Sequence, residues 1–291
     1  MRFDYYQPKD LQDTVSFLSK EGSSAQVLAG GTDLIPRIKD RLTSPKYVVN
    51  IKGLPELQGM GKEREGFRIG ALTTIRTLET SPVIRRQFPL LAQAAAALGS
   101  VQVRNIATVG GNLCHAVPSA DTAPPLLSLN ARATLIGPKG KRNLPLEDFF
   151  QGPRRTALQP GELLSELLLP PLPERWGGVY IKLGHRMAMD LAIVGVSALV
   201  VLDSAGRFQD CRIGLGAVAP TPVRAKQAEE ILRGEKFTEA ALEKASEIGM
   251  GECQPIDDIR ASRSYRCEMV KVLIHRAISQ ALAIAQKSKG N

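Results

Sequence analysis

The sequence predicts an α+β fold, and three of its features point to that class. Helical and extended runs alternate without a regular order before residue 170. Two long apolar runs, Leu191–Leu202 and Cys211–Ala219, are joined through Asp203-Ser204-Ala205-Gly206, and a connection this short joins antiparallel strands. The rest of the chain is expected to be helical, at 223–233, 238–248 and 264–286.

Residues 1–55 are expected to form a small α/β unit. Leu11, Val15 and Leu18 fall at positions i, i+4 and i+7 of a helix, and Gly22 ends that pattern. The elements expected after it are a strand at 26–29, a turn at Gly30-Gly31, a second helix and a strand at 47–51.

Residues 56–172 are expected to form a second unit, in which helices and strands alternate too irregularly for a doubly wound sheet. Thr73 and Thr74 can cap a short helix that ends near Ser81-Pro82. The other expected elements are strands at 67–72, 131–136 and 163–169, a helix at 89–98, a glycine-rich loop at 107–120 and a turn at 137–140. Because the proline-rich stretch Pro170–Pro173 is the best boundary, we predict three domains, 1–55, 56–172 and 173–291.

Composition excludes several classes of protein. The net charge of +9 suggests nucleic acid, but only 5% of the 291 residues are aromatic and the basic residues are dispersed, so a nucleic-acid binder is disfavoured. The sequence has no long uncharged apolar run, so no membrane-spanning helix is expected. The N-terminal sequence has no apolar signal core, and we therefore predict a cytoplasmic protein. The four cysteines form no CxxC pair, so a disulfide scaffold, a zinc ribbon or an iron–sulfur cluster held by this chain alone is not expected.

The first motif that could carry chemistry is Val27-Leu28-Ala29-Gly30-Gly31-Thr32-Asp33-Leu34, an extended run that leads into a Gly-Gly turn. Successive glycines allow backbone N–H groups to converge on one point, and a helix that starts near Asp33 would add a partial positive charge suited to a phosphate. A plain strand-to-helix turn, with glycines for geometry alone, explains this motif equally well.

The second motif, Thr108-Val109-Gly110-Gly111-Asn112, again places a Gly-Gly pair between a hydroxyl and an amide side chain. Two such loops together suit a diphosphate. No lysine follows them as in a P-loop. The one GxGxxA string, Gly214–Ala219, lies in the second strand of the expected hairpin and runs into Pro220, so a Rossmann NAD site is not expected.

These motifs also carry a family resemblance. The segments 29–39 and 107–127 look like the two flavin loops of the FAD-binding subunits of molybdenum hydroxylases, a family that includes subunits of carbon monoxide dehydrogenase, quinoline oxidoreductase, xanthine dehydrogenase and 4-hydroxybenzoyl-CoA reductase. The segments 182–192 and 262–277 are similar to two further segments of that family, in the same order. The resemblance implies a PCMH-type FAD-binding fold, with two α/β subdomains followed by a C-terminal domain of antiparallel sheet and helices.

The resemblance also implies a role for residues at matching positions. Both glycine loops would surround the diphosphate and ribityl of FAD, and Asp121 would hydrogen-bond the cofactor. Leu98 and Leu164 would line the flavin or the adenine. Lys182 would lie near the isoalloxazine, where a cation favours the anionic reduced flavin. Judged without the family, Lys182 is more simply a solvated charge at the end of a strand.

Three further features stay open or argue for no chemistry. Cys114-His115 invites a metal or thiolate, but neither residue has a second ligand at metal spacing, so we predict neither a metal site nor a nucleophile. Arg186 and Asp190, four residues apart, form either a weak surface ion pair or a pair that orders a loop over the flavin. Leu191 stands where some relatives have an aromatic residue, which leaves the shielding of the flavin face open.

The function that the resemblance implies is that of an FAD-containing electron-transfer subunit of a cytoplasmic molybdenum hydroxylase. Its partners would be a small [2Fe-2S] subunit and a large molybdopterin subunit, in a dimer of heterotrimers. It would pass electrons to NAD, a quinone or a redox protein. No residue resembles a general base for substrate, so we predict no catalytic residue in this chain. The alternative is a self-contained FAD-dependent oxidoreductase of the same flavin fold.

Overall fold

The first sheet of the computed structural model, which describes residues 2–288, is formed by three parallel strands in the order β1-β3-β2. Its elements are β1 (Asp4–Tyr6), α1 (Leu11–Glu21), β2 (Ala25–Leu28), α2 (Leu34–Lys39) and β3 (Tyr47–Asn50). Helix α1 buries Val15 and Leu18 beneath this sheet, and Asp10 caps it by accepting the N–H of Asp13. The predicted order of helix, strand, glycine turn, helix and strand is confirmed, and β1 is an addition that the sequence did not suggest.

The second sheet is antiparallel and has the order β4-β5-β10-β6-β7. Its strands are β4 (Met60–Glu63), β5 (Gly66–Gly70), β6 (Arg132–Gly137), β7 (Gly140–Pro145) and β10 (Leu163–Leu169). The helices around it are α3 (Ile75–Thr80), α4 (Pro82–Gln87), α5 (Pro89–Ala97), α6 (Val101–Ile106), α7 (Val109–Cys114) and α8 (Ala123–Ser128). Smaller elements are the strand pair β8 (Phe150–Gly152) and β9 (Arg155–Thr156), and the 3₁₀ turns Gly22–Ser24, Pro55–Leu57 and Leu146–Phe149.

One prediction in this region is wrong. The glycine-rich stretch 107–120 is not a continuous loop, because α7 begins directly after Thr108. The Thr108 side chain caps the helix by accepting the N–H of Gly111 at 3.1 Å. Glycine disfavours helix, but contacts with the chain around β5 hold the first turn in place, since the N–H of Val109 donates to Thr73 and that of Gly110 donates to Ala71.

The third sheet is antiparallel, has the order β11-β12-β13-β14, and contains the predicted hairpin. Its elements are β11 (Trp176–Leu183), β12 (Val194–Leu202), β13 (Phe208–Gly216), β14 (Val223–Arg224), α9 (Lys226–Leu232), α10 (Glu239–Gly251) and α11 (Arg263–Lys287). The three predicted helices are present, although the first one begins later than expected because Val223–Arg224 pairs with β13.

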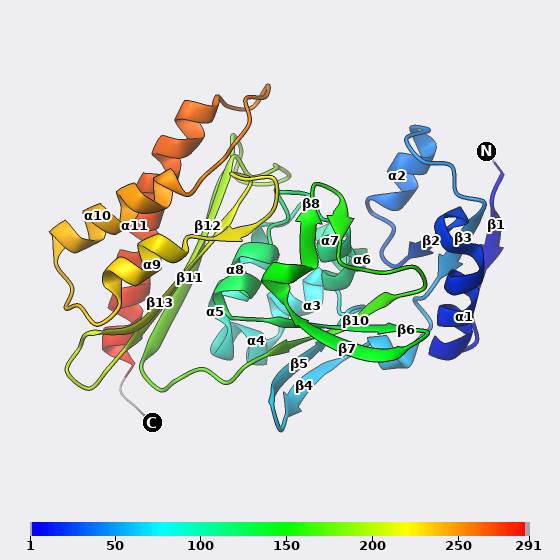
Figure 1. Ribbon diagram of the computed structural model, residues 1–291, viewed down its shortest axis with the longest axis horizontal. Coiled ribbons are helices and arrows are strands. Elements are labelled where there is room, and N and C mark those ends of the chain that lie inside the picture. Colours follow the sequence, from blue (N-terminus) through cyan, green and yellow to red (C-terminus); the bar gives the residue numbers. More distant parts are fainter. Residues whose placement is uncertain (1, 289–291) are drawn as a thin grey trace.

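The third sheet is covered on both faces. In β12, Leu199 and Val201 belong to the core of the second unit, whereas Ala198 and Val200 belong to a core shared with α9–α11. This alternation places successive side chains on opposite faces, as in any strand. Figure 1 shows the result: the first sheet with α1 and α2 lies at one end, the third sheet with α9–α11 lies at the other, and the second sheet lies between them. No helix within residues 2–288 is long and apolar enough to cross a membrane.

Candidate functional site

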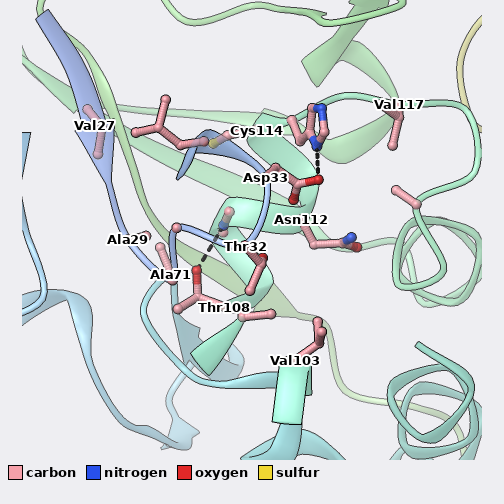
Figure 2. A pocket seen from close by; sticks show the side chains of 18 of the residues that line it. Val27, Ala29, Thr32, Asp33, Ala71, Val103, Thr108, Asn112, Cys114 and Val117 are labelled. Carbon is pink, nitrogen blue, oxygen red and sulfur yellow. Dashed lines mark hydrogen bonds and ion pairs between the residues drawn. The ribbon is translucent and has the colours of Figure 1, made fainter. Parts of the chain in front are cut away.

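A cavity of about 730 Å³ lies where the first sheet meets the second unit, within the size range of small-molecule sites. Its walls come from the turn after β2, from the chain around α6 and α7, and from the loop between β11 and β12. Figure 2 shows Thr32 and Asp33 of the first wall beside Thr108 and Asn112 of the second. The fold therefore brings the two glycine motifs, residues 27–34 and 108–112 of the sequence, to one site.

Most residues predicted to bind a cofactor line this cavity. They are Val27, Ala29, Gly30, Gly31, Thr32, Asp33, Leu34, Leu98, Thr108, Gly110, Gly111, Asn112, Asp121 and Leu164. Leu28, Val109 and Lys182 are not part of the wall; Val109 is fully buried in the core, and Lys182 reaches the site through Asp121.

The first glycine loop offers free backbone donors. No group within residues 2–288 accepts the N–H of Gly31, Thr32, Asp33 or Leu34, so these four amides are available to a ligand. Gly31 has φ of +76°, a conformation that glycine adopts without strain. A Cβ at Gly30 would collide with the carbonyl oxygen of Ile106, because the two loops touch through their backbones there.

The second glycine loop uses its amides differently. The N–H of Gly110 donates to the carbonyl of Ala71 at 2.9 Å, and that of Gly111 donates to the Thr108 hydroxyl at 3.1 Å, the contact drawn as a dashed line at Thr108 in Figure 2. What this loop presents to the cavity is the side chain of Asn112, whose Oδ1 accepts a 2.6 Å hydrogen bond from Thr122. The fixed Oδ1 leaves the Asn112 amide hydrogens for a ligand. The two loops therefore differ in structure, although their sequences suggest the same chemistry.

Asp121 lies at the centre of a buried polar network beside the cavity. Its Oδ2 accepts a 2.9 Å hydrogen bond from Lys182 Nζ, and its Oδ1 accepts one of 2.8 Å from the Tyr180 hydroxyl. Lys182 also donates to the carbonyl of Ala97 at 2.9 Å. Burial raises the pKa of Asp121, against the opposing effects of Lys182 and Tyr180, and burial also raises the pKa of Tyr180 well above its ordinary value.

This network corrects the simpler explanation of Lys182. The Lys182 side chain is only 10% exposed, so the expectation of a solvated surface charge is wrong. Its positive charge is matched by the carboxylate of Asp121, which makes the pair close to neutral as a unit. Lys182 and Tyr180 lie on β11, and the network therefore also ties the third sheet to the wall of the cavity.

The loop between β11 and β12 closes one side of the cavity, which Met189, Asp190 and Leu191 line. Asp190 Oδ2 accepts the backbone N–H of Arg186 at 3.0 Å and also that of His185. These backbone hydrogen bonds, that of Arg186 first, hold the pKa of Asp190 below its ordinary value. The Arg186 side chain lies 3.9 Å from the carboxylate, so Asp190 orders the loop mainly through backbone amides and not through the ion pair.

Cys114 and His115 both line the cavity. Burial raises the pKa of the Cys114 thiol to about 12, so the thiol is protonated near neutral pH and is a poor nucleophile. His115 Nδ1 lies 2.8 Å from Asp33 Oδ1, and its Nε2 is buried with no partner. Within residues 2–288, no group of three or more His, Cys, Asp or Glu side chains is arranged to hold a metal ion.

Several lining residues were not identified from the sequence. They include Arg37, Ala71, Ser100, Val103, His115 and Ser119. Tyr180 was missed as well, because a tyrosine in an apolar strand carries no local sign that its hydroxyl meets a buried carboxylate. For His115 a signal existed, since it lies three residues after the end of the second glycine motif.

The Arg142–Glu162 ion pair, whose Glu162 lines the cavity, predicts acid-sensitive stability. Arg142 Nε and Nη2 each donate a 2.7 Å hydrogen bond to Glu162, and this interaction holds the Glu162 pKa below its ordinary 4.5. A depressed carboxyl pKa adds stability above pH 4.5 that is lost as pH falls through the folded-state pKa. Because Arg142 is 39% exposed, Glu162→Gln should lower the unfolding free energy at pH 7 by only about 1 kcal/mol.

Urea unfolding of the wild type and Glu162→Gln across this pH range measures the effect. The difference between the two proteins should shrink as the pH falls below 4.5. A difference that stays constant with pH would contradict this prediction.

Comparison with protein families identifies both parts of the chain. Residues 1–172 match the FAD binding domain in molybdopterin dehydrogenase, and residues 179–281 match the CO dehydrogenase flavoprotein C-terminal domain. The carbon monoxide dehydrogenase medium chain of Hydrogenophaga pseudoflava is 35% identical over 97% of this chain and 98% of its own. A putative xanthine dehydrogenase FAD-binding subunit of Escherichia coli K12 is 34% identical over 97% of this chain and 96% of its own.

Solved structures agree with the sequence matches. A carbon monoxide dehydrogenase chain from Hydrogenophaga pseudoflava superimposes with a TM-score of 0.94 at 35% identity, covering 97% of this chain and 98% of its own. A quinoline 2-oxidoreductase chain from Pseudomonas putida 86 gives 0.90 at 28% identity, with 98% of each chain covered. The predicted α+β FAD-binding fold is therefore confirmed. This chain belongs to the family of FAD-binding subunits of molybdenum hydroxylases, and it is an oxidoreductase component whose cofactor is FAD.

Proposed function

We propose that this chain binds FAD in the 730 Å³ cavity and serves as the electron-transfer subunit of a molybdenum hydroxylase complex. The observation that carries the proposal is the meeting of the two glycine loops at this cavity, where four amides of the first loop have no partner in residues 2–288. Unpaired N–H donors and small residues that admit close approach suit a diphosphate, and apolar Leu98 and Leu164 suit a ring system.

Most of the predicted site residues receive a specific role under this proposal. The amides of Gly31–Leu34 and the hydroxyl of Thr32 would bind the diphosphate, and Asn112 would donate its amide hydrogens to the cofactor. Gly30, Gly110 and Gly111 have no side chain, which would let the segments around the cofactor pack closely against one another. Leu98 and Leu164 would contact the flavin or the adenine. The remaining residues would act without touching the cofactor: Leu28 and Val109 would support the loops, and Lys182 would position Asp121, which lines the cavity.

Bound FAD can accept electrons one at a time and release them in pairs. We propose that it receives them from [2Fe-2S] clusters of a small subunit, while a large molybdopterin subunit oxidises the substrate. The acceptor would be NAD, a quinone or a redox protein. The cavity wall supports this assignment of roles, because each of its four carboxylates within residues 2–288 already has a partner: Asp121 pairs with Lys182, Asp190 with backbone amides, Glu162 with Arg142 and Asp33 with His115. None of them is free to act as a general base on a substrate.

We further propose that the complex is a dimer of heterotrimers located in the cytoplasm. Within residues 2–288 the four cysteines are free thiols, which suits a reducing compartment. The domain division 1–55, 56–172 and 173–291 is also proposed, and it is supported by the presence of one of the three larger sheets in each segment.

The purified chain should be yellow, with FAD extractable at about one per chain, because the cavity is open to a ligand without rearrangement of its loops. An absorption spectrum and quantification of the released flavin test this directly. A colourless protein that does not take up added FAD would contradict the assignment of the cavity.

Purification from the native source tests the partners. A cysteine-rich small subunit and a large molybdenum subunit should accompany the chain. If the chain is isolated alone and yet oxidises a substrate, it is instead a self-contained FAD oxidoreductase.

A further inference from the structure

Arg266, near the start of α11, is a charged side chain buried at a place where packing alone favours an apolar one. It is 2% exposed, and the same face of α11 continues with buried Val270 and Ile274 at positions i+4 and i+8. Its Nε has no partner within residues 2–288. A buried ion pair often stabilises a fold no more than apolar residues of similar volume, and a cation near a helix N-terminus opposes the helix dipole. Stability alone therefore does not account for an arginine at this position.

The guanidinium of Arg266 connects three segments of the chain. Its Nη1 donates to the carbonyl of Ile193 at 2.6 Å and to that of Ala217 at 3.4 Å, and its Nη2 donates to Asp258 Oδ1 at 2.7 Å. Ile193 directly precedes β12, and Ala217 directly follows β13. Asp258 lies between α10 and α11, and its carboxylate orients the guanidinium toward the two carbonyls.

Both carbonyls belong to stretches of chain that continue into the cavity wall. Ile193 is two residues beyond Leu191, with which the β11–β12 loop lines the cavity. The N–H of Ala217 donates at 2.7 Å to the carbonyl of Pro118, and the residues on either side of Pro118 line the cavity. Ala217 has φ of +65°, a conformation that a residue other than glycine keeps only when its surroundings hold it there. Arg266 thus links two parts of the wall from outside the cavity.

We propose that Arg266 is a positioning residue of the FAD site, which holds the β11–β12 loop and residues 117–121 at a fixed separation around the cofactor. This rests on the proposal that FAD occupies the cavity. Arg266 is not part of the cavity wall, so it acts only through the carbonyls of Ile193 and Ala217. Without it, both segments gain freedom to move, and the cofactor is held less firmly between them.

Arg266→Met tests the proposal, because methionine keeps a long apolar stem but has no hydrogen-bond donor. Asp258 would keep three hydrogen bonds, from the amides of Arg260 and Ala261 and from the Arg260 side chain, and it is 22% exposed. Its charge is therefore not stranded, and the variant should fold. We expect FAD to bind about tenfold more weakly and to dissociate correspondingly faster. Arg266→Lys keeps the charge but lacks the planar fork that spans several acceptors, so it should bind FAD about fivefold more weakly.

Arg212→Met is the matched control. Arg212 also belongs to the third sheet, pairs with an aspartate of similar exposure, Asp210 at 24%, and donates to a backbone carbonyl, that of Ser128. Neither Arg212 nor its partners line the cavity. The control should lower the free energy of unfolding by an amount comparable to Arg266→Met, while its FAD affinity stays within about twofold of the wild type.

Two measurements on the full-length chain separate positioning from general stability. The first is the dissociation constant and dissociation rate of FAD, with flavin removed and then titrated back. The second is amide hydrogen exchange of the flavin-free protein. Exchange should become faster in residues 184–192 and 117–121 of Arg266→Met and should be unchanged in both segments of Arg212→Met.

The outcomes distinguish this inference from the proposed function. If the wild type does not bind FAD, the proposed function fails and the inference fails with it. If the wild type binds FAD and Arg266→Met binds it equally well, or Arg212→Met weakens binding as much, then Arg266 is only a structural residue and the proposed function stands without it. Should Arg266→Met not fold, Arg266→Lys decides, because FAD affinity and exchange equal to those of the wild type would overturn the inference.

Discussion

Gly30→Ala is expected to weaken FAD binding by about 100-fold, the largest effect on the cofactor among the changes we consider. The new Cβ would collide with the carbonyl oxygen of Ile106 and approach the Cα of Ala107 to 2.9 Å. Both obstacles are backbone atoms, so no side chain can rotate away and the two loops must separate. Overpacking of this kind costs about 1–3 kcal/mol, and here the displacement also moves the unpaired amides of Gly31–Leu34 away from the ligand.

The FAD dissociation constant measures this effect, and Gly61→Ala is the matched control. Gly61 lies in β4, has no heavy atom within 4 Å of an added Cβ, and is not part of the cavity wall. The control should bind FAD normally and change the unfolding free energy by less than about 0.5 kcal/mol. Equal FAD affinity in Gly30→Ala and in the wild type would mean that the contact between the loops does not shape the site.

The largest effect on stability is expected from Lys182→Met. The change removes the ammonium that neutralises Asp121 and leaves a carboxylate that is 6% exposed without its cation. Breaking a buried ion pair from one side lowers the free energy of unfolding by about 3–5 kcal/mol, because the remaining charge stays away from water. The Tyr180 hydroxyl still donates to Asp121, but one neutral hydrogen bond cannot replace the ammonium.

Urea unfolding of three variants tests this prediction. Lys226→Met breaks an ion pair with Glu147 whose partners are 62% and 39% exposed, and it should cost less than about 1 kcal/mol. Asp121→Asn combined with Lys182→Met removes both charges and should be more stable than Lys182→Met alone. A loss in Lys182→Met no larger than in Lys226→Met would show that the Asp121–Lys182 pair is not electrostatically buried.

Much of the fold could be predicted from the sequence because its signals are local. Leu11, Val15 and Leu18 mark the apolar face of α1, and two long apolar runs with a short connection identify the β12–β13 hairpin. Other elements exist only because of their neighbours. The strands β1 and β14 are three and two residues long and depend on pairing with β3 and β13.

The helix α7 shows how tertiary contacts can oppose local preference. Its sequence, with Gly110 and Gly111 in the first turn, favours a loop. In the folded chain, the carbonyls of Ala71 and Thr73 accept two of its amides, and Gly110 packs so tightly on Ala71 that no larger residue fits. Gly110 is thus required by the close approach of Ala71, the residue after β5, and no property of the segment itself reveals that contact.

By itself, the sequence determined the class of fold, the two glycine motifs and, through its resemblance to a family, the identity of the cofactor. The tertiary structure alone decided how those motifs work: which amides stay free, that Lys182 is neutralised by Asp121, and that His115 meets Asp33. The physical reason is that periodicity and glycine content depend only on residues that are close together in the sequence. A buried charge or an unpaired ring nitrogen, in contrast, depends on which distant segments the folded chain brings into contact and shields from water.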